Sequence, residues 1–225
     1  MQGDSVIIVA GGEGKRMGQP IPKQFLMLGD YPVLWHSLLA FHNYDPDIPV
    51  ILVLHKDWIA YWQEETRRFF PSLNYKITPG GETRFHSVRN GLTLIPEGDF
   101  TAVHDASRPL VSSALIERTF RAAREKGNAI PVLPATDSLR ILTPEGNRPL
   151  DRRQVRYVQT PQIFPTDLLK KAFRQEYRPE FTDEATVVER LGKTIHMIEG
   201  EKRNIKITTG FDSKVARLLL NSNNQ

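Results

Sequence analysis

The stretch "VIIVAGGEGKRMG", from Val6 to Gly18, joins an apolar run to a glycine-rich loop. Its first five residues are all apolar, which is typical of a strand buried on both faces of a parallel sheet. The glycines that follow carry no side chain, so the backbone of the loop can approach a ligand closely. Lys15 and Arg16 then add two positive charges. The stretch therefore predicts a buried strand that ends in a site for an anionic ligand.

Further apolar runs alternate with amphipathic segments along the rest of the chain. Strands are expected at 6–10, 50–54, 101–104, 130–133, 195–198 and 205–208. Helices are expected at 33–42, 58–70, 84–94, 113–126, 166–176 and 213–220. This alternation predicts an α/β fold with a doubly wound, mainly parallel sheet. In such a sheet, ligands bind beyond the carboxyl ends of the strands, which is where the glycine-rich loop lies.

The composition restricts the class of protein. A chain of 225 residues has the size of one large domain, so a single domain over residues 1–225 is expected. The chain has no cysteine, no apolar stretch of about 20 residues and no basic segment followed by an apolar one at its N-terminus. We therefore expect a cytoplasmic protein without disulfides or membrane spans. The net charge is +4, and the cations are spread along the chain with no block longer than Arg152-Arg153. This distribution favours small phosphorylated ligands over nucleic acid.

The segment 136–158 interrupts the alternation of strands and helices. It reads "TDSLRILTPEGNRPLDRRQVRYV", with turn-forming residues at 144–147 between two β-like pieces. This pattern predicts a β-hairpin outside the main sheet. An excursion of this size is usually a lid or an arm that contacts another subunit.

Two standard nucleotide-binding loops do not fit the glycine-rich stretch. A Walker A loop requires Ser or Thr after its Gly-Lys pair, but this chain has Arg16 there. A dinucleotide fingerprint requires a third glycine where this chain has Met17. The simplest alternative is a tight turn followed by a solvated charge pair. Against it, Arg16 and Lys23 could together neutralise a polyphosphate, and Pro22 restrains the backbone just before Lys23.

Two later motifs place glycine and carboxylate groups at the ends of predicted strands. Gly80 and Gly81 follow a short strand and precede a helix, where their backbone could contact a nucleotide base or form a plain turn. Asp105 follows a buried strand within "VHDASRPL". Its carboxylate could bind a metal ion or a sugar hydroxyl at the carboxyl end of that strand, or it could pair with Arg108.

Several motifs resemble one family in content and order. "AGGEGKRM" followed by "PKQF" resembles the activation loop of sugar-nucleotide and polyol-phosphate nucleotidyltransferases. "VHDASRP", "LDRRQVRYVQTPQIF", "FTDEA" and "NIKIT" together resemble the 2-C-methyl-D-erythritol 4-phosphate cytidylyltransferase family over nearly the whole chain. The resemblance implies a Rossmann-like sheet, CTP and a polyol phosphate as substrates, and a divalent cation such as Mg²⁺. It also implies a homodimer whose hairpin arms cross between subunits.

By position, the resemblance implies three groups of site residues. The catalytic residues would be Arg16, Lys23, Arg152 and Lys206. The nucleotide would be bound by Ala10, Gly11, Gly12, Gly14, Gly80, Gly81, Ser87 and Ala106. The polyol phosphate would be bound by Asp105, Arg108, Ser138 and Thr182, with Ser138 and Arg152 reaching the neighbouring subunit's substrate. A metal ion would be held by Asp105 or through the CTP phosphates.

The chain departs from the family at two positions, and other functions stay open at this point. Gly11 stands where the family usually has alanine, and Ser138 where it usually has threonine. In the implied reaction the acceptor phosphate is already anionic, so no general base is required. The alternatives are a ribitol-5-phosphate cytidylyltransferase, a basic RNA- or DNA-binding module, and a nucleotide sensor that binds CTP without catalysis.

Overall fold

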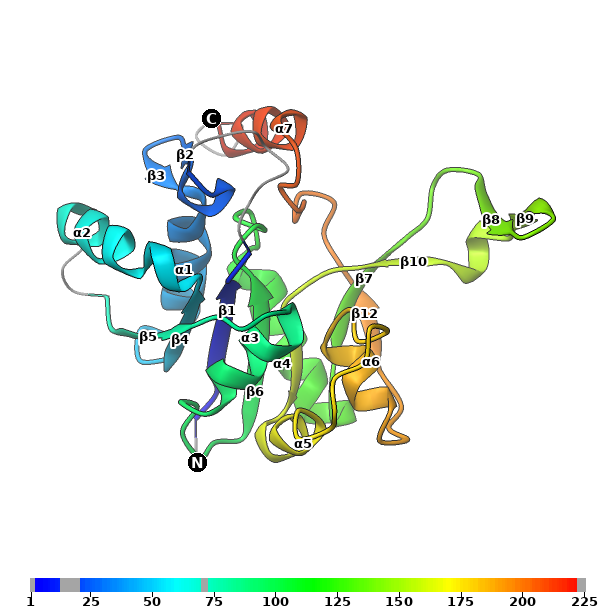
Figure 1. The fold of residues 1–225 in the computed structure, drawn as a ribbon, viewed down its shortest axis with the longest axis horizontal. Helices are drawn as coiled ribbons and strands as arrows, with labels where there is room; N and C mark the ends of the chain where they lie inside the picture. The colour runs from blue at the N-terminus through cyan, green and yellow to red at the C-terminus, as the bar shows by residue number, and fades with distance from the viewer. Residues whose placement is uncertain (1–2, 13–20, 70–72, 222–225) are drawn as a thin grey trace.

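A five-stranded sheet forms the centre of the computed structural model, which describes residues 3–12, 21–69 and 73–221 (Figure 1). Its strands stand in the order β11 (Gln162–Pro165), β6 (Phe100–Asp105), β1 (Ser5–Ala10), β4 (Val50–Leu54) and β5 (Tyr75–Pro79). β11 runs antiparallel to β6, and the other four strands are parallel to one another. This arrangement confirms the predicted α/β fold with a mixed, mainly parallel sheet.

Helices cover both faces of this sheet because successive strand residues point to opposite sides. Val6 and Ile8 of β1 belong to one core with α1 (Val33–Tyr44), α2 (Ile59–Phe69) and α4 (Ser113–Lys126). Ile7, which lies between them, belongs to a second core with α3 (Arg84–Leu92), α5 (Thr166–Ala172) and α6 (Glu184–Glu189). All three β1 side chains are fully buried, and each contributes about 1.5–3 kcal/mol relative to an exposed side chain. The described helices include none with the length and apolar character that a membrane crossing requires.

A smaller sheet lies next to the central one. Its order is β10 (Arg156–Val158), β7 (Ile130–Pro134) and β12 (Met197–Glu199). The other described elements include the short β2 (Met27–Leu28) and β3 (Tyr31–Pro32) pair and helix α7 (Gly210–Asn221). The strand predicted at 205–208 is wrong, because this segment forms no strand.

The segment 205–208 is held in place by contacts with the loop after β6 and not by pairing in a sheet. The backbone N–H of Ile207 donates to the carbonyl oxygen of Ser107 at 2.8 Å, and the Ile207 side chain is buried. Its alternation of apolar and polar residues therefore reflects packing against the loop after β6. The same alternation in a sequence is typical of a strand, which explains the wrong prediction.

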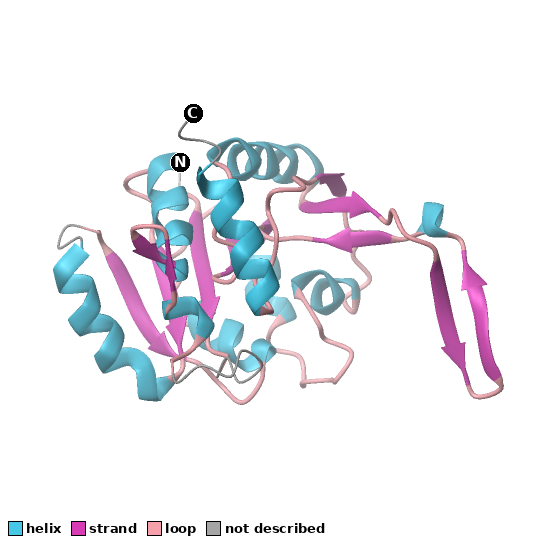
Figure 2. Cartoon of the chain, turned by 90° about the horizontal axis from the view of Figure 1, so that it is seen from above, coloured by secondary structure: helices cyan, strands magenta, loops and turns pink. Residues whose placement is uncertain are grey.

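A β-hairpin projects away from both sheets (Figures 1 and 2). It consists of β8 (Leu139–Thr143) and β9 (Gly146–Leu150), with Thr143 opposite Gly146 and a two-residue connection between them. The structure thus has a hairpin within the segment 136–158, where the sequence predicts one, and its role as an arm between subunits stays a prediction. Arg156–Val158 is strand β10 of the smaller sheet, where Tyr157 and Val158 are paired with the apolar residues of β7.

Candidate active site

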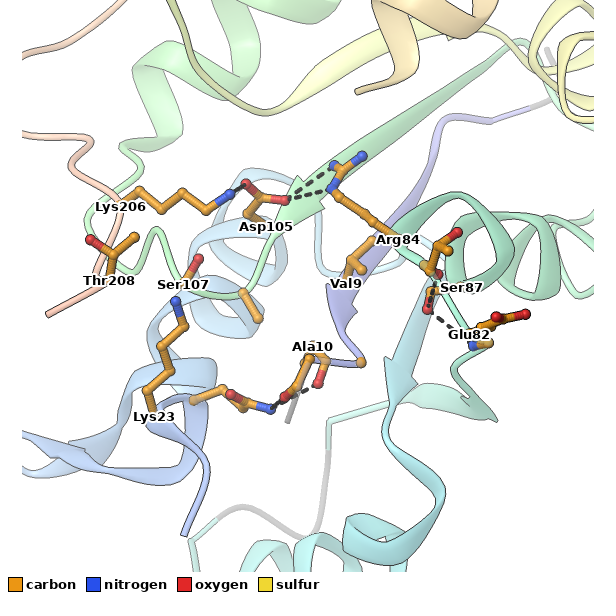
Figure 3. Close-up of a pocket in the computed structure, with 16 residues that line it drawn as sticks. Val9, Ala10, Lys23, Glu82, Arg84, Ser87, Asp105, Ser107, Lys206 and Thr208 are labelled. Atoms are coloured by element: carbon orange, nitrogen blue, oxygen red, sulfur yellow. Dashed lines mark hydrogen bonds and ion pairs between the residues drawn. The ribbon is translucent and has the colours of Figure 1, made fainter. Parts of the chain in front are cut away.

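A pocket of about 420 Å³ opens at the carboxyl ends of β1 and β6 (Figure 3). The register of β1 places Val9 opposite Asp105, so the loops after the two strands start side by side. Six of the residues that the sequence assigned to the nucleotide line this pocket: Ala10, Gly11, Gly12, Gly81, Ser87 and Ala106. Three assigned charged residues line it as well: Lys23, Asp105 and Lys206.

The glycines form a slot in which two backbone segments nearly touch. A Cβ atom added to Gly11 would lie 3.0 Å from the hydroxyl oxygen of Ser87, and one added to Gly80 would lie 3.1 Å from it. The Ser87 hydroxyl donates to the carbonyl oxygen of Thr83 at 3.0 Å and accepts from the N–H of Gly81 at 3.1 Å. The slot is therefore held by backbone groups and one serine, and its bare edges suit a flat ligand. Gly80 packs against Gly11, where an added Cβ would lie 3.3 Å from the Gly11 Cα, and it does not line the pocket itself.

A short 3₁₀ turn fixes Lys23 and the glycine-rich loop together. It spans η2 (Lys23–Phe25), and Pro22 precedes it with φ of −58°. The Lys23 ammonium donates to the carbonyl oxygen of Ile207 at 2.6 Å. The buried Gln24 side chain donates to the carbonyl oxygens of Ala10 and Gly12 at 2.8 and 3.0 Å. Gln24 is therefore a structural member of the site that sequence reasoning missed, although it lies within the quoted "PKQF" motif.

Asp105 lies in the pocket among three cations. Its Oδ1 accepts from Arg84 Nε at 3.1 Å, and its Oδ2 lies 2.8 Å from the Lys206 ammonium. Arg108 Nε lies 3.8 Å from Oδ2. Burial alone would raise the pKa of Asp105, but Arg84, Lys206 and Arg108 outweigh it and hold that pKa well below its usual range. The carboxylate is thus permanently ionised, and the local excess of positive charge favours an anionic ligand.

Arg84 is a second site residue that sequence reasoning missed. It is the first residue of α3, where the helix dipole disfavours a cation. Its guanidinium contacts Asp105 and the fully buried carboxylate of Glu184, and these two carboxylates raise its pKa against the effect of burial. The only available signal in the sequence was an arginine at an unfavourable helix position, which indicates a carboxylate partner without identifying Glu184.

The described residues do not fit a resident metal ion. Asp105 already faces three cations, so a further cation there would be repelled. No group of three or more His, Asp or Glu side chains that could hold an ion occurs in the described part of the chain. The interpretation of Asp105 as a metal ligand therefore has no support from its surroundings.

The remaining predicted site residues lie outside the pocket or outside the described residues. Arg108 donates to the carbonyl oxygens of Asn204 and Val158, beside the pocket. Thr182 and Ser138 are exposed, and Arg152 lies in η4 (Arg152–Gln154) after the hairpin and donates to the carbonyl oxygen of Thr136. These three do not line the pocket of their own chain. Gly14 and Arg16 fall outside the described residues.

A buried histidine supports the loop that carries Asp105. The Asp105 N–H donates to the Thr160 hydroxyl, which donates to Nδ1 of His104, each at 3.1 Å. His104 Nε2 donates to the carbonyl oxygen of Arg108 at 3.1 Å. This chain of hydrogen bonds requires the neutral imidazole. Burial lowers the pKa of His104 to about 4, which keeps it neutral at physiological pH.

The titration of His104 predicts a loss of stability in acid. The unfolded side chain binds a proton near pH 6.5, whereas the folded one does so only near pH 4. The free energy of unfolding should therefore fall by about 3 kcal/mol as the pH drops through this range, and be fully retained above it. Urea denaturation at several pH values should show a shallower dependence for His104→Asn than for the wild-type protein. An unchanged slope in His104→Asn would refute the assignment.

A glycine-lined slot beside a cluster of cations, at the carboxyl edge of a mainly parallel sheet, is the arrangement expected of a nucleotidyltransferase. The family profile described as "IspD: 2-C-methyl-D-erythritol 4-phosphate cytidylyltransferase" matches residues 5–222. The chain therefore belongs to this family, as its motifs predicted.

Individual relatives agree with the family profile. The 2-C-methyl-D-erythritol 4-phosphate cytidylyltransferase of Bacteroides thetaiotaomicron is 46% identical over 96% of this chain and 99% of its own length. The solved structure of the enzyme with the same name from Thermus thermophilus is 31% identical, with a TM-score of 0.78 over 98% of this chain and 100% of that one. The structure of the bifunctional IspDF from Campylobacter jejuni is 32% identical over 94% of this chain, with a TM-score of 0.80. This chain spans about half of that longer protein, 53% of its length.

Proposed function

We propose that this protein transfers the cytidylyl group of CTP to 2-C-methyl-D-erythritol 4-phosphate. The products are 4-diphosphocytidyl-2-C-methyl-D-erythritol, an isoprenoid precursor of the non-mevalonate pathway, and pyrophosphate. One observation supports the proposal most strongly: the glycine-lined slot, Lys23, Asp105 and Lys206 all belong to the same pocket. Membership of the family over residues 5–222 supports the choice of substrates.

The proposed reaction is an in-line displacement at the α-phosphorus of CTP. An oxygen of the acceptor phosphate forms the new P–O bond, and the bond to the β-phosphate breaks with release of pyrophosphate. The attacking oxygen is already anionic at neutral pH, so no side chain needs to remove a proton. The protein contributes mainly by holding two anions together and by stabilising the charge that develops between them.

The resemblance to the family suggests a role for each of these residues, and the shared pocket of Lys23, Asp105 and Lys206 supports it. Lys23 lines the same pocket as Gly11 and Gly12, and with Arg16 it would neutralise charge at the α-phosphate. Lys206 would hold the acceptor phosphate, while Asp105 would accept from a polyol hydroxyl. Arg108 and Thr182 would complete the polyol side. A divalent cation such as Mg²⁺ would arrive bound to the CTP phosphates, as part of the substrate.

A homodimer would complete the site through the hairpin. Leu142 of β8 is 83% exposed, and its neighbour Ile141 is 39% exposed, so two adjacent apolar side chains of the hairpin face solvent. Ser138 and Arg152 lie at the two ends of the hairpin and do not line the pocket of their own chain. Both observations support an arm that packs on a second copy and brings these residues to the second copy's pocket. The single-domain organisation over residues 1–225 and the cytoplasmic location stay predictions.

The proposed function predicts a specific pattern of pyrophosphate release. With CTP and Mg²⁺, the protein should release pyrophosphate with 2-C-methyl-D-erythritol 4-phosphate at a kcat/KM far above that with ribitol 5-phosphate. The phosphate-holding cations serve both acceptors, so the difference should arise from the polyol contacts of Asp105. A preference for ribitol 5-phosphate would overturn the choice of polyol. CTP binding without any release would favour a sensor, and salt-sensitive binding to RNA or DNA would favour a nucleic-acid module.

A further inference from the structure

The glutamate of the "FTDEA" motif, Glu184, is fully buried and does not line the pocket. Glu184 has no exposed surface and is the first residue of α6, which Asp183 caps through a capping box with Thr186. Both Glu184 oxygens contact the guanidinium of Arg84, and the Nη2–Oε2 distance is 3.0 Å. A fully buried carboxylate without such a partner would be costly. Glu184 therefore needs an explanation that substrate binding does not supply.

The planar guanidinium of Arg84 connects two carboxylates. Nη1 and Nη2 bind Glu184, and Nε and Nη2 contact Asp105 Oδ1, both at 3.1 Å. Because these nitrogen atoms lie in one rigid plane, the bidentate grip of Glu184 fixes the edge that faces Asp105. A lysine at position 84 would keep the charge and lose this orientation.

Asp105 passes this orientation on to the substrate side of the pocket. Its Oδ1 is held by Arg84, which leaves Oδ2 for the Lys206 ammonium at 2.8 Å (Figure 3). Lys206 lies in a segment without a strand, so the carboxylate of Asp105 supplies a contact that fixes its long side chain. The nucleotide slot has no such dependence, because Ser87, Gly81 and the Thr83 carbonyl hold it without the guanidinium.

We propose that Arg84 and Glu184 form a positioning pair for the acceptor half of the active site. Glu184 orients Arg84, Arg84 orients Asp105, and Asp105 holds Lys206 where the acceptor phosphate binds. The pair does not touch the reacting atoms in this scheme. The inference rests on the proposed function, since it names which of the two substrates the pair serves.

The test separates the two substrates kinetically. Arg84→Lys keeps the charge, and Glu184→Gln keeps the shape of the side chain while removing its charge. Each variant should raise the KM for 2-C-methyl-D-erythritol 4-phosphate by about 10-fold or more, because a small misplacement of a binding group is costly. The KM for CTP should stay within about 2-fold of the wild-type value. Arg89→Lys, an exposed arginine on the same helix, is the matched control and should change neither.

A double substitution tests whether Arg84 acts through Asp105. In an Asp105→Asn background, Arg84→Lys should add no further increase in the acceptor KM, because the two residues act as one unit. A further increase there would mean that Arg84 binds substrate itself and would overturn the positioning role. The positioning role would also be overturned if the KM values for CTP and for the acceptor rose equally. It would likewise be overturned if a variant lost folded protein while both KM values stayed unchanged. If Arg84→Lys does not fold, Glu184→Gln provides the same measurements; inactive wild-type protein would instead overturn the proposed function.

Discussion

Lys23→Met is expected to lower kcat by about 10²–10³-fold while the protein stays folded, because in the proposed mechanism it removes a cation that stabilises charge developing in the transition state. Lys23 lies in a 3₁₀ turn whose other two residues, Gln24 and Phe25, are buried and anchor the turn. The anchor does not depend on the lysine side chain, so the glycine-rich loop should keep its hydrogen bonds to Gln24. Steady-state pyrophosphate release and thermal unfolding are the two measurements.

Lys56→Met is the matched control for this prediction. Lys56 is an exposed lysine that also begins a 3₁₀ turn, η3 (Lys56–Trp58), but it does not line the pocket. The same chemical change should therefore leave kcat at the wild-type value. A Lys23→Met protein with wild-type kcat would exclude charge stabilisation by this residue. A large fall in its unfolding temperature would show that the Lys23 contact with the Ile207 carbonyl is structural.

The sequence predicts the central sheet well because its strands carry their own signal. Val50–Leu54 is entirely apolar and entirely buried, so composition alone marks it as an interior strand. β11 carries no such signal, because Gln162 begins it and its pairing with β6 is set by tertiary contacts. The segment at 205–208 shows the converse error, since a strand-like alternation has no strand partner there. Local pattern predicts which side chains are buried more reliably than which backbone they pair with.

The site was predictable where its residues lie in contiguous motifs. Gly11 and Gly12 directly follow β1, and Asp105 is the last residue of β6, so their positions in the pocket follow from the topology of the sheet. Lys23 lies further along the chain in η2, and the contiguous "PKQF" motif identified it. The contact of Arg84 with Glu184 joins residues 100 positions apart, and no spacing rule connects them. Ser138 and Arg152 are a third case, because a second copy of the chain, which no single sequence displays, would be needed to give them a role.

A heterodimer with one substitution on each chain should recover activity that both parents lack. In the proposed site, Arg152→Ala would remove the contact to the acceptor phosphate, and Lys23→Met would remove the contact to CTP. If the arms cross, the pocket of the Arg152→Ala chain contains its own intact Lys23. The Lys23→Met chain contributes its intact Arg152 to that same pocket. One of the two sites is then wild type, so heterodimers isolated through two different affinity tags should show about half of the wild-type activity.

A second heterodimer of identical composition gives the opposite result and makes the test decisive. When both substitutions are placed on one chain and the other chain is wild type, crossed arms leave each site with one defect, and activity should stay near zero. Arms that served their own chain would reverse the pattern, because the wild-type chain would then keep a complete site. Activity in the second heterodimer and none in the first would therefore contradict the crossed arm. Failure to recover any doubly tagged dimer would contradict dimerisation itself.

The exposed Leu142 allows a separate test of the proposed dimer. Leu142→Glu should weaken the dimer without altering the pocket of the same chain.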